Sequence, residues 1–269
     1  MDRYAVVGNP IKHSKSPQIH KAFADQTDQE LTYVALLAEI DEFQQTVKSL
    51  QREGGKGMNI TVPFKQQAYD FADELSERAE LAKAVNTYIF QKNGSIRGDN
   101  TDGVGLVRDI INNHDGRIAD KRILVIGAGG AVRGVLGPLL AENPRQLVIA
   151  NRTLEKAQAL ADDFAPYGDI EACAFNRLQG HFDWIINGTA ASLQGEVPAI
   201  PEAIIDANTN CYDMMYGKNV TPFNQWALDH GAKAAYDGFG MLVEQAAESF
   251  RLWRGVMPST RMLVKELRA

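Results

Sequence analysis

The chain has 269 residues, of which 45% are hydrophobic and 23% are charged, and its formal net charge is −6. These values are typical of an ordinary globular protein that is long enough for two domains or one large one. The acidic balance argues against a nucleic-acid partner, which needs a basic face, and no apolar run reaches the roughly 18 residues of a membrane span.

The first hundred residues alternate between strand and helix patterns. Short apolar or β-branched runs predict strands at residues 4–8, 31–37, 58–63 and 85–90. Helical spacing of apolar residues predicts helices that begin near Pro17 and that cover 40–53, 64–71 and 75–84. Polar side chains collect in the loops at the strand ends. This segment is therefore predicted to form one α/β unit.

A second unit begins near Gly103. Residues 123–126 predict a buried strand, and this strand runs into a turn made of Gly127, Ala128, Gly129, Gly130 and Ala131. Glycines let the chain turn tightly and let a diphosphate approach the backbone N–H groups at the start of a helix. Further strands are predicted at 147–150, 184–187 and 210–214, and an amphipathic helix at 240–253. The order strand, glycine turn, helix, strand predicts a dinucleotide-binding βαβ unit.

The second strand of this βαβ unit ends in Asn151-Arg152-Thr153, and Lys156 follows one turn later. An NAD-binding unit carries an acidic residue at this place for the ribose 2′-OH, whereas a cation suits a 2′-phosphate. We therefore predict NADP as the cofactor, bound by the glycine turn and these four residues. Taken alone, the turn could belong to an unrelated α/β domain, and Arg152 and Lys156 could be ordinary surface cations.

The N-terminus and the cysteines bear on the compartment. The first four residues lack the charged and then hydrophobic layout of a signal peptide. Cys173 and Cys211 are isolated in the sequence, so we expect reduced thiols and a cytoplasmic protein. The five histidines form no His-x-x-x-His pair, and no metal site is predicted.

Motifs along the whole chain resemble those of the shikimate dehydrogenase family and follow that family's order. They are Gly8-Asn9-Pro10, Ser14-Lys15-Ser16-Pro17, Asn59-Ile60-Thr61-Val62-Pro63-Phe64-Lys65, Ala84-Val85-Asn86-Thr87, Gly98-Asp99-Asn100-Thr101-Asp102-Gly103, 127–131, 151–153, Tyr212-Asp213-Met214 and 238–247. Two places depart from the commonest pattern. Val132 stands where a small residue usually follows Ala131, and Asn187-Gly188-Thr189-Ala190 stands where Asn-Ala-Thr-Ser is more usual.

The resemblance implies reversible reduction of 3-dehydroshikimate to shikimate with NADPH, in aromatic amino-acid biosynthesis. It also implies an α/β fold of two domains with a cleft between them. Residues 1–102 plus 238–269 would form the substrate-binding domain, and residues 103–237 a Rossmann-type NADP-binding domain. The resemblance adds Met214 and Gly238 to the cofactor-binding residues. The expected assembly is a monomer or a homodimer.

Oxidation of a secondary alcohol requires removal of the hydroxyl proton, and the resemblance and the residue type both point to Lys65. A lysine moves a proton near neutral pH when burial lowers its pKa, or as an ammonium acid in the reducing direction. A neighbouring Asp102 favours the charged lysine, and the sequence leaves both routes open. We assign proton transfer to Lys65, and orientation and hydroxyl binding to Asp102. Taken alone, Lys65 could be a surface residue and Asp102 a helix cap.

A substrate with one carboxylate and three hydroxyls needs many directional contacts. Ser14 and Ser16 lie two residues apart before a helix and can donate hydrogen bonds to the carboxylate, although both could instead be capping residues. A phenol from Tyr216 could be added near the carboxylate. Mixed donors and acceptors for the ring hydroxyls are supplied by Asn59, Thr61, Asn86 and Gln245.

Two other functions remain open. A quinate or quinate/shikimate dehydrogenase would need more room near Ser14 and Ser16 for an additional hydroxyl, and it could show relaxed cofactor use. A non-catalytic NADP(H)-sensing module would keep the glycine turn and Arg152 without needing Lys65 and Asp102. The two serines, and Arg152 in place of an acidic residue, favour shikimate and NADP, and the presence of the whole polar set argues against a sensor.

Overall fold

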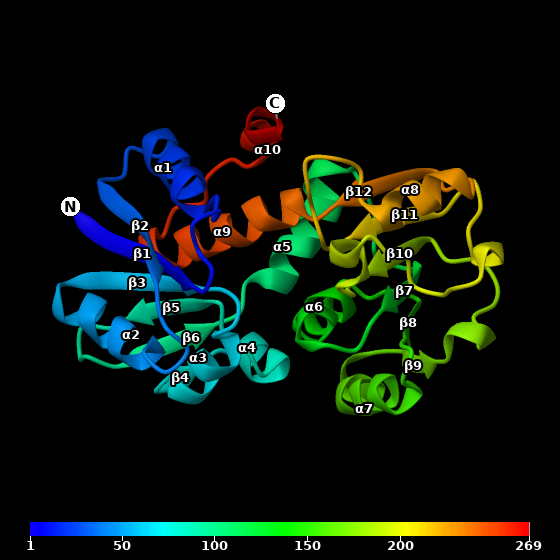
Figure 1. The fold of residues 1–269 in the computed structure, drawn as a ribbon, viewed down its shortest axis with the longest axis horizontal. Helices are drawn as coiled ribbons and strands as arrows, with labels where there is room; N and C mark the ends of the chain where they lie inside the picture. The colour runs from blue at the N-terminus through cyan, green and yellow to red at the C-terminus, as the bar shows by residue number, and fades with distance from the viewer. Residues whose placement is uncertain (269) are drawn as a thin grey trace. The chain divides into compact units, whose positions relative to one another are not determined.

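The computed structural model describes residues 1–268 and divides the chain into two compact units. The first unit is Met1–Gly105 with Val243–Ala269, and the second is Leu106–Leu242. Both boundaries fall inside helices, because α5 (Asp102–Arg108) and α9 (Phe239–Arg254) each contribute residues to both units. The sequence-based division at 102/103 and 237/238 lies three to five residues earlier. Each unit is an α/β fold built on its own sheet (Figure 1).

The sheet of the first unit has the strand order β2-β1-β3-β5-β6-β4. Strand β1 pairs in parallel with β2 and β3, whereas β3–β5 and β5–β6 are antiparallel, so the sheet is mixed. Its strands are β1 (Asp2–Gly8), β2 (Leu31–Leu37), β3 (Gly55–Ile60), β4 (Glu74–Leu75), β5 (Thr87–Phe90) and β6 (Ile96–Asp99). Its other helices are α1 (Ser16–Gln26), α2 (Phe43–Arg52), α3 (Lys65–Phe71), α4 (Glu77–Ala82) and α10 (Arg261–Arg268).

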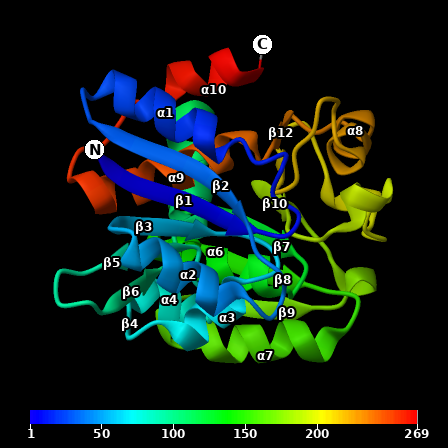
Figure 2. The ribbon, with the colours of Figure 1, turned by 60° about the vertical axis from the view of Figure 1, so that its left-hand side comes forward.

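Helices cover both faces of this first sheet. Helices α2, α3 and α4 lie on one face, and α1 and α9 lie on the other (Figures 1 and 2). The apolar stripe of α2, made of Phe43, Val47 and Leu50, packs against Met58 of β3 and other buried residues of one core cluster. On the opposite face the Trp253 ring of α9 stacks on the Tyr4 ring of β1. Because helices cover the two faces of the sheet, the polar ends of its strands lie at the edge of the layered core.

The second unit is a parallel sheet with the order β12-β11-β10-β7-β8-β9. This is the doubly wound order of dinucleotide-binding domains, in which the ligand lies beyond the carboxyl ends of the strands where the winding reverses. Its strands are β7 (Arg122–Ile126), β8 (Gln146–Ala150), β9 (Ile170–Cys173), β10 (Trp184–Asn187), β11 (Asn210–Asp213) and β12 (Ala234–Asp237). Its helices are α6 (Gly130–Ala141), α7 (Leu154–Phe164), α8 (Pro222–Asp229), a π-helical turn Asp109–Asn113, and short 3₁₀ turns at Ala165–Tyr167, Phe175–Arg177, Ala191–Gln194 and Glu202–Ile204.

Three expectations about local structure were wrong in detail. The segment 75–84 is not one helix: Glu74–Leu75 pairs with β6, and α4 begins only after Ser76, whose hydroxyl accepts from the Ala79 N–H and caps it. The strand predicted at 58–63 ends at Ile60, because the chain then turns, with the Phe64 N–H donating to the Thr61 carbonyl at 3.0 Å. Strands β9 and β12 were not predicted because neither is a continuous run of β-branched or large apolar residues.

No helix within 1–268 is long and apolar enough to cross a membrane. No group of three or more His, Cys, Asp or Glu side chains within the same range could hold a metal ion.

Candidate active site

Lys65 and Asp102 form an ion pair in the first unit. Lys65 is the first residue of α3 and Asp102 the first residue of α5, and Lys65 Nζ donates to Asp102 Oδ2 over 2.6 Å. Their side chains are 33% and 18% exposed, so the pair lies at the surface of the unit but is largely shielded. The other carboxylate oxygen, Oδ1, accepts from Asn86 Nδ2 at 2.8 Å. The structure therefore joins the two residues predicted to handle the proton.

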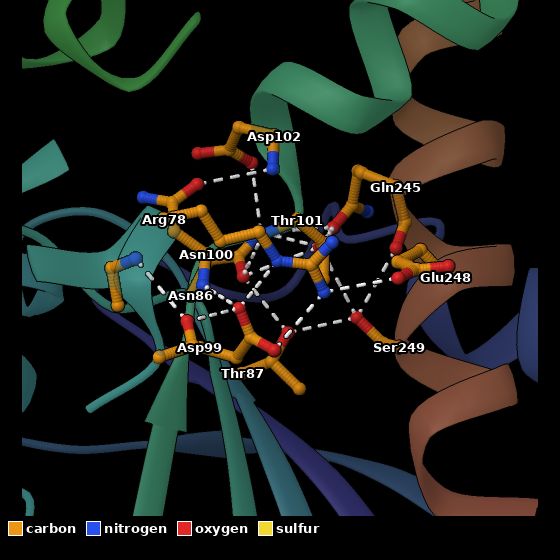
Figure 3. Close-up of polar contacts among 12 residues, drawn as sticks. Arg78, Asn86, Thr87, Asp99, Asn100, Thr101, Asp102, Gln245, Glu248 and Ser249 are labelled. Carbon is orange, nitrogen blue, oxygen red and sulfur yellow. Dashed lines mark hydrogen bonds and ion pairs between the residues drawn. The ribbon is translucent and has the colours of Figure 1, made fainter. Parts of the chain in front are cut away.

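Asn86 is the centre of the polar network around this pair (Figure 3). Besides Asp102, its Nδ2 lies 2.9 Å from Thr101 Oγ1 and 3.2 Å from Gln245 Oε1. Its Oδ1 accepts from the Thr101 N–H at 2.9 Å and from Thr87 Oγ1 at 2.8 Å. Asn86 is 2% exposed, and burial of its amide is offset by these contacts. Asn86 and Gln245, both predicted to bind substrate, thus meet Asp102 within one network.

A cluster of charges lies next to this network, with buried Asp99 and Glu248 around a half-buried Arg78. Arg78 Nε and Nη2 donate to the two carboxylate oxygens of Asp99 at 2.6 and 3.0 Å, and Nη2 also donates to Glu248 Oε1 at 3.0 Å. Figure 3 shows Arg78 between β6 and α9. Asp99 Oδ1 accepts from the Asn100 N–H, and Asn100 Oδ1 accepts from the Asp102 N–H at 3.1 Å. Arg78 therefore ties the strand that precedes Asp102 to the helix that carries Gln245.

The predicted carboxylate-binding serines lie at the start of α1. The Ser16 N–H donates to Ser14 Oγ at 3.3 Å, and Ser16 is 8% exposed. Asn59 is 6% exposed, and its Nδ2 lies 3.0 Å from Ser249 Oγ. Thr61 follows β3, and its N–H donates to the Val7 carbonyl. Among residues 1–268, neither Ser14 nor Thr61 hydrogen bonds to the Lys65–Asp102 pair.

Tyr216 belongs to the second unit, whereas the other predicted substrate-binding residues belong to the first. Its side chain is 41% exposed and meets Phe239 edge to face, with 5.7 Å between the ring centroids. Burial of part of the ring and the nearby Asp237 raise the pKa of its phenol, so the hydroxyl is protonated at neutral pH.

The predicted glycine turn connects β7 to α6. Gly127 has φ +111°, a conformation that favours glycine. Gly129 is the N-cap residue of α6, and a Cβ added at Gly129 or Gly130 would meet nothing within 4 Å. Gly129, Gly130 and Ala131 are exposed. A twelve-residue helix therefore begins at exposed residues with open space beside them, and an exposed helix N-terminus suits a diphosphate.

The residues predicted to bind the 2′-phosphate lie after β8. Asn151 Nδ2 donates to the Thr153 carbonyl at 2.9 Å, and Thr153 is the N-cap residue of α7. Arg152 and Lys156 are exposed, and within residues 1–268 neither side chain forms an ion pair. Two unpaired cations beside an open helix terminus fit an anionic cofactor that carries a 2′-phosphate.

The two departures from the common sequence pattern touch each other. Val132 is fully buried in the first turn of α6, and its Cγ2 would lie 2.4 Å from a Cβ added at Gly188, which follows β10. Met214 Sδ would lie 3.1 Å from the same Cβ. The Met214 carbonyl oxygen in turn lies 2.2 Å from a Cβ added at Gly238, so Gly238 allows the chain after β12 to pass close to the chain after β11. The segments that follow β10, β11 and β12 therefore pack so closely that neither Gly188 nor Gly238 has space for one more methyl group.

Several residues of the network were not singled out from the sequence. Arg78 and Ser249 lie in helices outside the quoted motifs, and no local pattern marks them, whereas Thr87 stands in the quoted run Ala84–Thr87 without having been assigned a role. The run Gly98–Gly103 was recognised as a motif, and its density of polar residues after a strand was a usable signal for Asp99, Asn100 and Thr101. Their contacts depend on the antiparallel pairing of β5 with β6 and on α9, which are long-range features of the fold.

Family models match three stretches of the chain. They are described as the shikimate dehydrogenase substrate binding domain over residues 6–88, shikimate / quinate 5-dehydrogenase over 109–195, and the shikimate 5'-dehydrogenase C-terminal domain over 238–264. The chain is 56% identical over 268 residues to a shikimate dehydrogenase (NADP(+)) of Psychromonas ingrahamii, covering 100% of this chain and 98% of the relative. It is also 56% identical to the protein of that name from Vibrio campbellii, covering 100% and 96%.

Solved structures resemble the whole chain as well. The shikimate 5-dehydrogenase of Thermus thermophilus, solved in complex with NADP(H) and shikimate, superposes with a TM-score of 0.88 at 29% identity, covering 100% of this chain and 99% of that one. An Ael1 enzyme from Pseudomonas putida superposes with a TM-score of 0.95 at 45% identity, covering 99% and 98%. The likeness therefore extends over both units.

Proposed function

The chain belongs to the shikimate dehydrogenase family, and from that premise we propose that it catalyses the reversible, NADP-dependent reduction of 3-dehydroshikimate to shikimate. The observation that carries the proposal is the 2.6 Å ion pair between Lys65 and Asp102, set in a network of amide and hydroxyl groups. A non-catalytic NADP(H) sensor has no need of this set. A solved relative in complex with NADP(H) and shikimate supports the same substrate and cofactor.

The cofactor would be bound by residues of the second unit. The open N-terminus of α6 at Gly127–Ala131 suits the diphosphate, and Arg152 and Lys156 suit the 2′-phosphate. Asn151, Thr153, Met214 and Gly238 complete the proposed cofactor-binding residues. When bound, NADPH supplies the hydride for the reduction. The protein's own part is to position the carbonyl and to deliver the proton.

Proton delivery falls to Lys65 in this proposal. In the reducing direction its ammonium gives a proton to the oxygen that becomes the hydroxyl, and in the oxidising direction the neutral amine accepts that proton back. Asp102 holds Nζ through Oδ2 and is itself held by Asn86 through Oδ1, so the donor is oriented before the substrate arrives. A carboxylate has about four lone-pair sites, so Asp102 keeps acceptor capacity for a substrate hydroxyl.

The remaining polar residues would orient the substrate. We propose that Ser14 and Ser16 donate to the carboxylate, with the protonated phenol of Tyr216 as a further donor. Asn59, Thr61, Asn86 and Gln245 would bind the ring hydroxyls. The first unit would thus be the substrate-binding domain and the second the NADP-binding domain. We further propose a cytoplasmic enzyme that acts as a monomer or homodimer, and residual use of quinate or NAD is the alternative within the same family.

NADPH absorbance tests the proposal directly. We expect fast turnover with shikimate and NADP⁺, and little with quinate or NAD⁺. Lys65→Ala should abolish turnover and leave NADP⁺ affinity, measured by titration of the protein, intact. Preference for quinate would move the enzyme to the alternative. Full activity in Lys65→Ala, or no activity of the wild-type chain with either substrate, would contradict the proposed mechanism.

A further inference from the structure

Thr87 is the fully buried residue that directly follows Asn86 in the chain, and it is the first residue of β5. Its hydroxyl oxygen lies 2.8 Å from Asn86 Oδ1, 3.1 Å from Asn59 Nδ2 and 2.8 Å from Ser249 Oγ. Asn59 stands opposite Thr87 in the antiparallel pairing of β3 with β5, whereas Ser249 comes from α9. One hydroxyl group therefore joins three segments of the first unit (Figure 3).

The direction of the Thr87 hydroxyl proton follows from the other partners of Asn86. Asn86 Oδ1 accepts from the Thr101 N–H at 2.9 Å, and a backbone N–H can only donate. Asn86 Nδ2 donates to the Asp102 carboxylate at 2.8 Å, and an ionised carboxylate can only accept. These two contacts fix which end of the amide faces Thr87. The Thr87 hydroxyl must therefore donate its single proton to Asn86 Oδ1.

The two remaining contacts of the Thr87 hydroxyl are ones in which it accepts. Asn59 Nδ2 donates to it at 3.1 Å, and an amide nitrogen can only donate. Ser249 Oγ, 2.8 Å away, can donate to it or to the Gln245 carbonyl, which lies one turn earlier at 3.1 Å. Ser249 is fully buried, as Thr87 is, so solvent does not compete for these contacts. The hydroxyl is therefore held as a donor to Asn86.

We propose that Thr87 is a positioning residue that sets the orientation of the Asn86 amide. With Oδ1 held by Thr87 and by the Thr101 N–H, Nδ2 faces Asp102 and can face the substrate hydroxyl that Asn86 is proposed to bind. The inference rests on the proposed function, because it assumes that Asn86 meets the substrate. Thr87 itself makes no contact with substrate in this scheme. Its loss should weaken substrate binding and leave proton transfer by the Lys65–Asp102 pair nearly unchanged.

The test is Thr87→Val, which removes the hydroxyl and keeps a β-branched side chain of similar shape in the strand. Loss of one buried hydrogen bond that orients a binding group should raise KM for shikimate roughly three- to tenfold. The values of kcat and of KM for NADP⁺ should stay within about twofold of the wild-type values. Thr87→Ser keeps the hydroxyl, so its KM for shikimate should also stay within about twofold, although the loss of a buried methyl group lowers Tm.

The matched control is Thr260→Val. Thr260 is a buried threonine of the same unit, and its hydroxyl donates to Glu244 Oε1 at 2.6 Å, outside the network around Asn86. This variant should lower Tm without raising KM for shikimate. Ser249→Ala is a second test if Thr87→Val does not fold, because alanine suits a helix and the substitution removes one partner of the Thr87 hydroxyl. It should raise KM for shikimate roughly two- to fivefold.

A double variant tests the route through Asn86. If Thr87 acts by orienting Asn86, Thr87→Val should add little to the KM of Asn86→Ala, whereas two independent effects would multiply. Multiplicative effects would overturn the route. An unchanged KM for shikimate in Thr87→Val, or in Ser249→Ala where Thr87→Val does not fold, would overturn the positioning role.

The conservative variant and the control separate positioning from a general loss of stability. An equal rise in KM in Thr87→Ser and Thr87→Val, or a rise as large in Thr260→Val, would show a purely structural effect and would overturn the proposal. A wild-type chain that does not oxidise shikimate would count against the proposed function instead.

Discussion

The contact between Val132 and Gly188 makes a quantitative prediction for Gly188→Ala. The new Cβ would lie 2.4 Å from Val132 Cγ2 and 3.1 Å from Met214 Sδ, where carbon atoms normally keep about 3.5–4.0 Å. Val132 is fully buried in a helix, and a β-branched side chain in a helix has one strongly preferred rotamer, so it cannot turn away cheaply. Overpacking of this kind costs about 1–3 kcal/mol. The free energy of unfolding should fall by that amount.

The same contact predicts that a second substitution rescues the first. Val132→Ala alone removes two buried methyl groups and should cost about 1–3 kcal/mol. In the double variant the methyl group introduced by Gly188→Ala enters the space that Val132 leaves. The double variant should therefore be more stable than the sum of the two single effects predicts, with a coupling of about 1 kcal/mol or more.

Urea unfolding at a constant m-value measures all four corners of this cycle. The control is Gly130→Ala in the same turn, where an added Cβ meets nothing within 4 Å and stability should be kept. Additivity within about 0.5 kcal/mol would refute the reasoning, because the two sites would then not share the space. A cost of Gly188→Ala no larger than that of Gly130→Ala would refute it as well.

Three further predictions concern charge. Arg152→Ala should raise KM for NADP⁺ about tenfold or more, through loss of a charged hydrogen bond, and leave KM for NAD⁺ unchanged in the same absorbance assay. Burial lowers the pKa of His20 to about 3 from 6.5, so the unfolded chain binds more protons than the folded chain between these pH values. The contribution of neutral His20 to the free energy of unfolding is therefore complete above pH 6.5. It is lost as the pH falls, by about 2 kcal/mol at pH 5. Urea unfolding at pH 7 and pH 5 should therefore show a smaller fall in the free energy of unfolding for His20→Phe than for the wild type or for a variant of the exposed His13. Equal falls in all three proteins would contradict this prediction. Arg78→Met leaves two buried carboxylates without this partner and should cost about 3–5 kcal/mol, whereas Arg251→Met, at a 44% exposed side chain, should cost about 1 kcal/mol or less in the same assay.

The parts of the fold that were predictable from sequence are those fixed by local chemistry. The β7–turn–α6–β8 unit was predicted because an apolar run, three glycines and a second apolar run follow one another within about thirty residues. The α/β class and the family were predicted and confirmed. The short strands β4, β9 and β12 were not, because their pairing is decided by neighbouring strands that lie elsewhere in the sequence.

The candidate site likewise has residues that sequence motifs predicted and contacts that they did not predict. Lys65, Asp102, Asn86 and Gln245 were named from motifs, and the structure joins them by hydrogen bonds across the first unit. The hydrogen bond between Tyr33 and Asn59 was not predicted, because Tyr33 stands inside an ordinary strand run and belongs to no quoted motif. That contact depends on the parallel pairing of β1 with both β2 and β3, which brings the Tyr33 hydroxyl to 2.7 Å from Asn59 Oδ1 although 26 residues separate them.

The two sequence departures illustrate why single positions are poor units of interpretation. Viewed separately, Val132 adds bulk at the turn where the diphosphate is expected, and Gly188 removes a methyl group after β10. In the structure the bulk of one fills the space left by the other, and Gly127, between them, keeps its tight turn with Val132 Cγ2 at 3.2 Å from a Cβ added there. Because Val132 fills the space beside Gly188, α6 packs closely against the chain that follows β10, and the turn that precedes α6 is the place where we propose that the diphosphate binds.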